Sequence, residues 1–206
     1  MENVKRRERT ARTSQKPRPR NPAATREALM TAAARIFNHE GYFATDTNAI
    51  ARAAGYAPAS FYKHFADKAA ILLAVYEDYV RREWAGLEAA MAGETVLQKR
   101  LRRALGFIIG FHGEWAAFRT TLRAVARIEP AVAEALKASR ARQLGYLAAA
   151  TGLSAQRHRA TLLMILGIVE RLAETVLDAE ATSPPIRREV LLEEAERALL
   201  ALVERK

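Results

Sequence analysis

Apolar residues along most of this chain recur every three or four positions, which is the period of an amphipathic helix. In the first such segment Leu29, Ala33 and Ile36 fall on one face, and Gly41 follows as a residue that commonly ends a helix. No segment alternates β-branched and polar residues between turn residues, which is the pattern of a strand. The sequence therefore predicts an all-α protein.

Capping residues divide the chain before Gly93 into four predicted helices. Thr45 or Asp46 can cap the second helix, and Pro58 fits the first turn of the third, where its missing N–H would have no partner. The other predicted boundaries are the N-caps Thr25 and Asp67 and the helix ends Gly41 and Gly55. Beyond Gly93 we expect helices at about 95–111, 115–127, 131–150, 154–179 and 187–204, with breaks at Gly113, Pro130, Gly152 and Pro184.

The predicted helix at 154–179 is apolar around most of its circumference, and the helix at 187–204 is amphipathic. A helix that is apolar on several faces must be buried on several faces. The two helices can form half of a four-helix dimer interface, or the first can be the central core helix of a monomer. The interface residues would be Leu162, Ile165, Val169, Leu172, Val176, Leu192 and Leu199.

Charge is distributed unevenly over the 206 residues, which carry a formal net charge of +10. Residues 1–20 carry a net +6, residues 21–68 a net +1 and residues 69–206 a net +3. The first 24 residues also contain three prolines and almost no large apolar side chain, so we expect a flexible basic arm. This arm can insert Arg18 and Arg20 into a minor groove, add nonspecific affinity for DNA, or be a solvated tail. We favour nonspecific affinity.

Several function classes are disfavoured by composition. The chain has no cysteine, which excludes disulfides, thiolate metal sites and cysteine nucleophiles and fits a cytoplasmic location. No signal peptide is visible, and the longest run without charge, residues 143–156, is shorter than the roughly 20 apolar residues of a membrane span. The four histidines are far apart, and no phosphate-binding or HExxH motif occurs. We therefore expect no enzyme, no metal site and no cofactor.

Two predicted short helices separated by Gly55-Tyr56-Ala57 have the spacing of a helix-turn-helix. Residues 45–65 resemble the DNA-binding motif of the tetracycline-repressor (TetR) family, and the flanking residues 37–45 and 67–72 match that family as well. The resemblance implies a three-helix DNA-binding domain at residues 25–70, with its motif at about 46–65. It also implies a helical effector-binding and dimerisation domain at residues 71–206, and it favours the dimer interface over the monomer core.

The second helix of such a motif lies in the major groove. We expect Phe61 and Phe65 to pack against Ile50 and Ala54, so that the opposite side of this helix faces DNA. Lys63 can reach guanine, Ser60 can pair with several bases, and Pro58 and Ala59 offer only apolar contact. The resemblance implies backbone contacts by Thr45, Tyr62, His64 and Lys68, and Thr47 completes the expected DNA-binding set. Ala57 departs from the family's usual Ser or Thr cap, and Asp46 places a carboxylate where the family often has a hydroxyl.

Large aromatic residues among small ones mark the middle of the chain as a candidate effector pocket. The alternative is that the same aromatic residues are ordinary core. The pocket candidates are Phe107, Phe111, His112, Trp115, Phe118, Arg123 and Tyr146. Gly106, Gly110 and Gly113 lie among them, and we expect them to allow close helix packing or a bend.

These features together predict a homodimeric one-component transcriptional regulator. We expect it to be a repressor that binds double-stranded DNA at a short inverted-repeat operator and is released by a small-molecule effector. An activator of the same family is the first alternative. The second is an unregulated basic architectural DNA-binding protein, although that class would not need the large apolar second domain.

Overall fold

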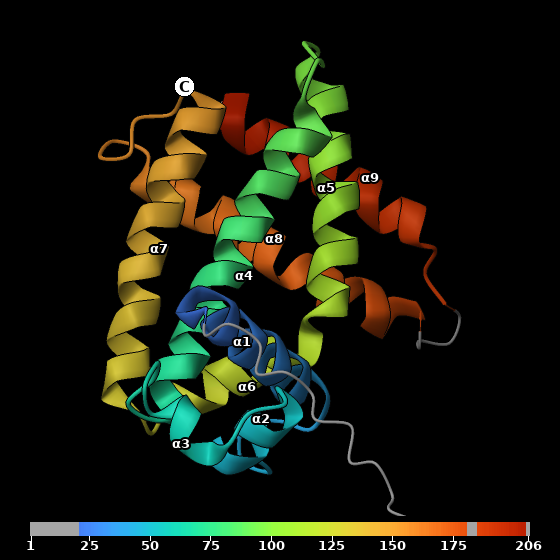
Figure 1. The fold of residues 1–206 in the computed structure, drawn as a ribbon. Helices are drawn as coiled ribbons and strands as arrows, with labels where there is room; N and C mark the ends of the chain where they lie inside the picture. The colour runs from blue at the N-terminus through green and yellow to red at the C-terminus, as the bar shows by residue number, and fades with distance from the viewer. Residues whose placement is uncertain (1–20, 181–184, 205–206) are drawn as a thin grey trace, which may run out of the picture.

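The computed structural model describes residues 21–180 and 185–204, and within these residues it contains α-helices and no strand (Figure 1). The prediction of an all-α protein is confirmed. The expected groove-inserting residues Arg18 and Arg20 lie outside the described residues. The helices are α1 (Pro22–His39), α2 (Thr47–Ala53), α3 (Pro58–Phe61), α4 (Lys68–Met91), α5 (Leu97–Glu114), α6 (Ala116–Val125), α7 (Pro130–Thr151), α8 (Arg159–Glu180) and α9 (Arg188–Glu204).

Local capping chemistry explains where the first helices begin. Asp46 and Asp67 cap α2 and α4 as expected, since each accepts a hydrogen bond of 2.7 Å from a backbone N–H three residues later. The expected start of α1 at Thr25 is wrong, because Asn21 caps this helix and Pro22 occupies its first turn. The predicted arm therefore extends too far at its C-terminal end, and residues 22–24 are helical.

Two predicted features of the later helices are also wrong. α5 continues through the expected break at Gly113, and α8 begins at Arg159 rather than at 154. The turn before α8 is held by Ser154, whose backbone N–H donates to Nδ1 of His158 and whose carbonyl accepts from the backbone N–H of His158. The expected close packing at Gly106, Gly110 and Gly113 is absent, because no neighbouring atom lies within 4 Å of where their Cβ atoms would be.

The helices form two connected groups (Figure 1). α1, α2 and α3 gather at one end with α6, and their shared core includes the fully buried Phe37, Ile50, Phe61 and Phe118. α4 runs from this end into the second group, where it packs against α5. Since Phe118 and its neighbours on α6 belong to the first core, the helix-turn-helix end and the remainder of the chain are packed together.

The second group buries most of the residues that the sequence assigned to a dimer interface. α8 contacts α5, α7 and α9 of its own chain, which surrounds much of its circumference. The expected interface residues that are buried in this core are Leu162, Ile165, Leu172, Val176 and Leu199. These five side chains are therefore not on the surface of the protomer. Among its described side chains, α8 exposes the large apolar Leu163 and Met164, at 38% and 58%.

None of the described helices is both long enough and apolar enough to cross a membrane.

Candidate DNA-binding and ligand-binding sites

The segment from α2 to α3 is a compact two-helix unit. Gly55 has a φ of +81°, a left-handed conformation that glycine adopts without strain, and it ends α2 as expected. Phe61 and Ile50 are fully buried and Phe65 nearly so, which fixes α3 against α2. α3 itself has four residues and no side-chain cap at Ala57. A hydrogen-bonded turn extends it, since Phe65 N–H donates to the Phe61 carbonyl at 3.0 Å.

The predicted base-reading residues lie on the open side of this unit. Pro58, Ala59 and Lys63 are exposed, and Ser60 is partly exposed. His64, which was expected to contact the DNA backbone, is also partly exposed. Their position leaves them accessible to a groove, and their contacts with DNA stay predictions.

One hydrogen bond ties the exposed ends of the two helices together. The hydroxyls of Thr47, at the start of α2, and of Tyr62, just after α3, are 2.8 Å apart. Each hydroxyl can still accept or donate a further hydrogen bond. Both residues of the predicted DNA-binding set therefore have polar atoms at one place on the surface.

Lys68 and Thr45 have structural contacts that the sequence did not predict. Nζ of Lys68 donates to the backbone carbonyls of Tyr42 and Thr45, each at 2.8 Å, and lies 4.1 Å from the centroid of the Tyr42 ring. Burial lowers the pKa of Lys68 below its usual value. Thr45 is buried, and its hydroxyl points back at the carbonyl of Asp46. Lys68 therefore holds the segment before α2, and its contact with a phosphate stays a prediction.

Arg26 and Arg52 are exposed cations beside the motif that sequence reasoning did not single out. The guanidinium carbon of Arg26, on α1, lies 5.0 Å from the centroid of the Phe65 ring. The sequence signal would have been the basic residues on the helices that flank the recognition segment. Asp46 is exposed, and one oxygen of its carboxylate accepts a hydrogen bond from Ala49 N–H at the start of α2.

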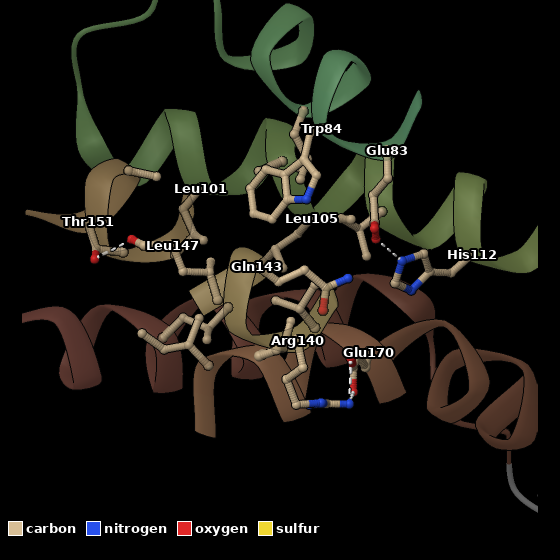
Figure 2. Close-up of a pocket in the computed structure, with 18 of the residues that line it drawn as sticks. Glu83, Trp84, Leu101, Leu105, His112, Arg140, Gln143, Leu147, Thr151 and Glu170 are labelled. Carbon is tan, nitrogen blue, oxygen red and sulfur yellow. Dashed lines mark hydrogen bonds and ion pairs between the residues drawn. The ribbon is translucent and has the colours of Figure 1, made fainter. Parts of the chain in front are cut away.

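A cavity of about 480 Å³ lies in the second group of helices (Figure 2). Its walls come from α4, α5, α6, α7, α8 and α9, and most of the lining side chains are apolar. Polar side chains interrupt this lining at a few places, including Glu83, His112, Arg140 and Glu170. An apolar cavity with a few convergent polar groups is the usual form of a small-molecule site.

Of the residues that the sequence assigned to the pocket, His112 and Arg123 line this cavity. Phe111, Trp115 and Phe118 instead form an aromatic cluster around Tyr79, with ring centroids 5.0, 5.4 and 6.0 Å from it. That cluster belongs to the core shared with the helix-turn-helix end. These assignments are therefore corrected in favour of the alternative interpretation, ordinary core.

The other two expected pocket aromatics also lie elsewhere. The ring of Phe107 packs against Gly86 of α4. Tyr146 is half-exposed on α7, and its ring centroid lies 4.8 Å from that of Trp84. Trp84 is the tryptophan that lines the cavity, so the sequence argument identified the right region and the wrong ring.

Sequence reasoning missed the pocket residues Glu83, Trp84, Arg119, Arg140 and Gln143. A usable signal was present for one of them. Glu83 follows Tyr79 by four positions, so it falls on the buried stripe of its helix, where a carboxylate needs a partner. Arg119, Arg140 and Gln143 carry no such signal, because polar residues are common on helices of this kind.

Charged groups in and beside the cavity wall are mostly paired. Nε2 of the buried His112 bonds Oε1 of Glu83, and Arg140 bonds both carboxylate oxygens of Glu170 at 2.9 and 3.0 Å. Arg123 bonds Glu174 at 2.8 Å. Burial alone would raise the pKa of Glu174, but the hydrogen bond and charge of Arg123 outweigh it and lower that pKa. Burial raises the pKa of Tyr79, so its phenol stays neutral.

No group of three His, Cys, Asp or Glu residues within residues 21–180 and 185–204 is placed to hold a metal ion.

Comparison with known proteins gives a consistent result. The segment from α2 to α3 consists of two helices joined through a glycine turn, with a buried inner face and an exposed second helix. This arrangement places the protein in the helix-turn-helix class of DNA-binding proteins. Residues 29–75 match the family model described as bacterial regulatory proteins, tetR family. No match is found among curated proteins.

Solved structures share the fold over nearly the whole chain. A TetR-family transcriptional regulator from Rhodococcus sp. is 24% identical, with a TM-score of 0.68 over 88% of this chain and 99% of that one. A fatty acid degradation regulator from Bacillus halodurans is 18% identical, with a TM-score of 0.64 over 89% and 97%. A regulator from Saccharomonospora viridis, solved in complex with choline, is 15% identical, with a TM-score of 0.65 over 89% and 97%. The matched segment is thus that of the tetR family, and the rest of the chain shares the fold of solved regulators of this family, as the sequence resemblance predicted.

Proposed function

We propose that the protein is a homodimeric one-component repressor, which binds a short inverted-repeat operator and leaves it when a small molecule occupies the cavity. The observation that carries this proposal is a cavity of about 480 Å³ whose walls include α4 and α6, two helices that also pack in the core of the helix-turn-helix end. The domain limits stay as proposed from the sequence, with the DNA-binding part at about 25–70 and the effector-binding and dimerisation part after it. We assign the protein the role of a repressor, and the alternative is a transcriptional activator with the same DNA-binding and effector sites.

Two physical links connect the cavity with the DNA-binding end. α4 begins at Lys68, next to the recognition segment, and carries Glu83 and Trp84 in the cavity wall. Asn38 of α1 makes the second link. Its Nδ2 donates to the Glu114 carbonyl at 2.7 Å, and its Oδ1 accepts from Phe118 N–H at 3.0 Å. A ligand that changes the α5–α6 junction can therefore move α1.

Dimerisation is needed to read an inverted repeat, because two recognition helices must lie about 34–36 Å apart or at a multiple of a helical turn. We assign the interface to the outer faces of α8 and α9, where Leu163, Met164 and Val190 are exposed. Leu192 of the original set is partly exposed and belongs to the same proposal, whereas Val169 lines the cavity and is left out of it. A ligand that prefers one spacing of the two protomers shifts the population towards it.

The test is footprinting and fluorescence anisotropy with the DNA upstream of the protein's own gene. We expect protection of a short inverted repeat at physiological salt. K63A should weaken binding by about tenfold or more and relax the base preference beneath it, whereas K99A, an exposed lysine on α5, should not. Binding without any preferred site would support an architectural protein and contradict the proposal.

A further inference from the structure

Two hydrogen-bond donors in the cavity wall have no partner within the described residues. They are Nη1 of Arg119 and Nε1 of Trp84, and both atoms are buried. Guanidinium and indole N–H groups can only donate. A buried donor without a partner is costly, and native structures usually satisfy it. An acceptor that enters the cavity would supply this missing partner.

A missing partner costs more free energy at Arg119 than at Trp84, because Arg119 carries a charge. Its side chain is 9% exposed, and its Nη2 donates to the backbone carbonyl of Glu170. None of the described carboxylates forms an ion pair with it, since Glu170 pairs with Arg140 and Glu83 bonds His112. A buried cation is stabilised by a nearby anion, and the fork of a guanidinium fits the two oxygens of a carboxylate.

The third unpartnered atom of the wall, Nδ1 of His112, leaves this conclusion unchanged. An imidazole nitrogen can donate or accept according to its tautomer and protonation. Nδ1 of His112 can therefore bond a donor or an acceptor on an incoming group, whereas the free N–H groups of Arg119 and Trp84 can bond only an acceptor.

Polar lining residues are concentrated towards one end and the middle of the cavity (Figure 2). Glu83 and His112 lie at one end and Arg140 near the middle, whereas Leu101 and Leu147 lie at the other end, beside Thr151, whose hydroxyl already donates to the Leu147 carbonyl. Along α5 the lining residues run from Leu97 to His112, which is about four helical turns or about 22 Å. The cavity thus suits an elongated molecule with one polar end.

We propose that the cavity binds an elongated amphipathic carboxylate, whose charged end pairs with Arg119 and whose apolar chain lies along Leu101, Leu105 and Leu147. This assignment rests on the proposed function, in which the cavity is the effector site. A cationic head group would face an unpaired guanidinium there, and the nearby carboxylates of Glu83, Glu170 and Glu174 already have partners. Arg100 also lines the cavity, but it is partly exposed at the apolar end.

The test is calorimetric titration of the full chain with octanoate, decanoate and dodecanoate, and with 1-decanol and decyltrimethylammonium as uncharged and cationic controls. We expect decanoate to bind at least about tenfold more tightly than 1-decanol, because a charged hydrogen bond replaces a neutral one. Equal or tighter binding of the alcohol or the ammonium compound would overturn the proposal. So would the failure of all three carboxylates to bind up to their solubility limits.

A matched pair of variants tests whether Arg119 binds the carboxylate group of the ligand. R119Q should reduce the preference for decanoate over 1-decanol to within about threefold, while R100Q should keep it. Thermal denaturation establishes that each variant is folded. If R119Q does not fold, W84F provides the second test, since it removes the indole donor and should weaken decanoate several-fold. Retention of the full preference in R119Q, or of full affinity in W84F where R119Q is unfolded, contradicts the assignment.

Operator release is measured separately, by anisotropy with the DNA that footprinting identifies. Release by decanoate in the wild type and not in R119Q supports the ligand class and the regulatory function together. Tight binding of decanoate without release contradicts the proposed function and leaves the ligand class supported.

Discussion

Lys68 shows how a single side chain can have a structural role at a position where the sequence suggested a DNA contact. Its ammonium group bonds two backbone carbonyls of the segment that leads into α2 and lies on the Tyr42 ring. The recognition segment therefore depends on this residue for its position. Any effect of a Lys68 substitution on DNA affinity would therefore include the displacement of the recognition segment.

The predicted consequence is a loss of stability on substitution. K68M removes both hydrogen bonds and leaves two carbonyls without their donor, so the free energy of unfolding should fall by about 2 kcal/mol. Urea denaturation measures this value. K63M is the control, because Lys63 is exposed, and it should change stability by less than about 0.5 kcal/mol. Equal stabilities for the two variants would show that the Lys68 contacts contribute little.

Residue-level prediction from sequence succeeded where the determining contacts are local. Asp46, Asp67 and Gly55 were placed correctly, because a cap or a left-handed turn depends on a few neighbouring backbone atoms. The pocket aromatics were misplaced, because an aromatic residue on a helical stripe looks the same whether it faces a cavity or a packed core. Only the neighbours of Phe111 in space, such as Tyr79, decide between the two.

At the scale of helices, the packing of α4 on α5 depends on one glycine. A Cβ atom at Gly86 would overlap the ring of Phe107, whereas a Cβ atom at Gly110 of α5 would meet nothing within 4 Å. From the sequence we expected close packing at the glycines of α5 and did not single out Gly86 of α4. The glycine that matters for close approach lies on the partner helix.

Substitution by alanine should therefore have opposite effects at the two sites. G86A should lower the free energy of unfolding by about 1 kcal/mol, since steric overlap outweighs the gain in helix propensity. G110A should raise it by about 0.5–1 kcal/mol, because only the propensity changes. Thermal or urea denaturation of both variants tests the prediction. A stabilising G86A would mean that the Phe107 ring moves aside at little cost.

The contact between α5 and α9 makes stability dependent on pH. Arg102 bonds the buried Glu196 carboxylate at 2.8 and 3.2 Å, and Gln98 bonds it at 2.7 Å. The hydrogen bond from Arg102, with that from Gln98, lowers the pKa of Glu196 against the opposing effect of burial. A carboxyl with a lowered pKa stabilises the fold above its unfolded pKa of about 4.3, and this stabilisation is lost as the pH falls through the folded value.

E196Q should therefore weaken the pH dependence of stability between about pH 5 and pH 3. The wild type should lose stability on acidification more steeply than this variant. Urea denaturation across that range provides the measurement, with E193Q as the control because Glu193 is exposed. Parallel curves for the wild type and E196Q would assign the acid sensitivity to other carboxyls.

At the scale of the whole molecule, α8 is the core helix of its own protomer and also presents apolar side chains to solvent. Its buried faces contain Leu162, Leu172 and Val176, whereas Leu163 and Met164 remain exposed. The sequence predicted that this helix is covered on several faces. It could not assign which faces are covered by the same chain, because a buried position inside a protomer and one between protomers have the same composition.

Charge at the exposed face should disrupt the proposed dimer. M164E should convert the protein from a dimer to a monomer in analytical ultracentrifugation and abolish footprinting of the inverted repeat, because two half-sites can no longer be bound together. The matched control is I128E, since Ile128 is also exposed and lies between α6 and α7. A dimeric M164E would place the interface elsewhere.

The overall architecture was predictable in outline because helix periodicity and the helix-turn-helix spacing are properties of the chain alone. The cavity was not, because it is bounded by six helices whose packing no single segment encodes. Arg119 illustrates the difference. On its own helix it is one of two arginines, and its importance comes from the absence of a carboxylate partner among the described residues around it.

The amide of Asn38 sets a limit on how such a protein can be divided and recombined. This residue belongs by sequence to the DNA-reading part, yet its side chain completes the end of α5 and the start of α6. A hybrid regulator made by joining this sensor to the reading head of another protein would need an asparagine at the equivalent place. Without it, the graft would have a backbone carbonyl and an amide unmatched at the junction, and of the two links between the cavity and the DNA-binding end only α4 would remain.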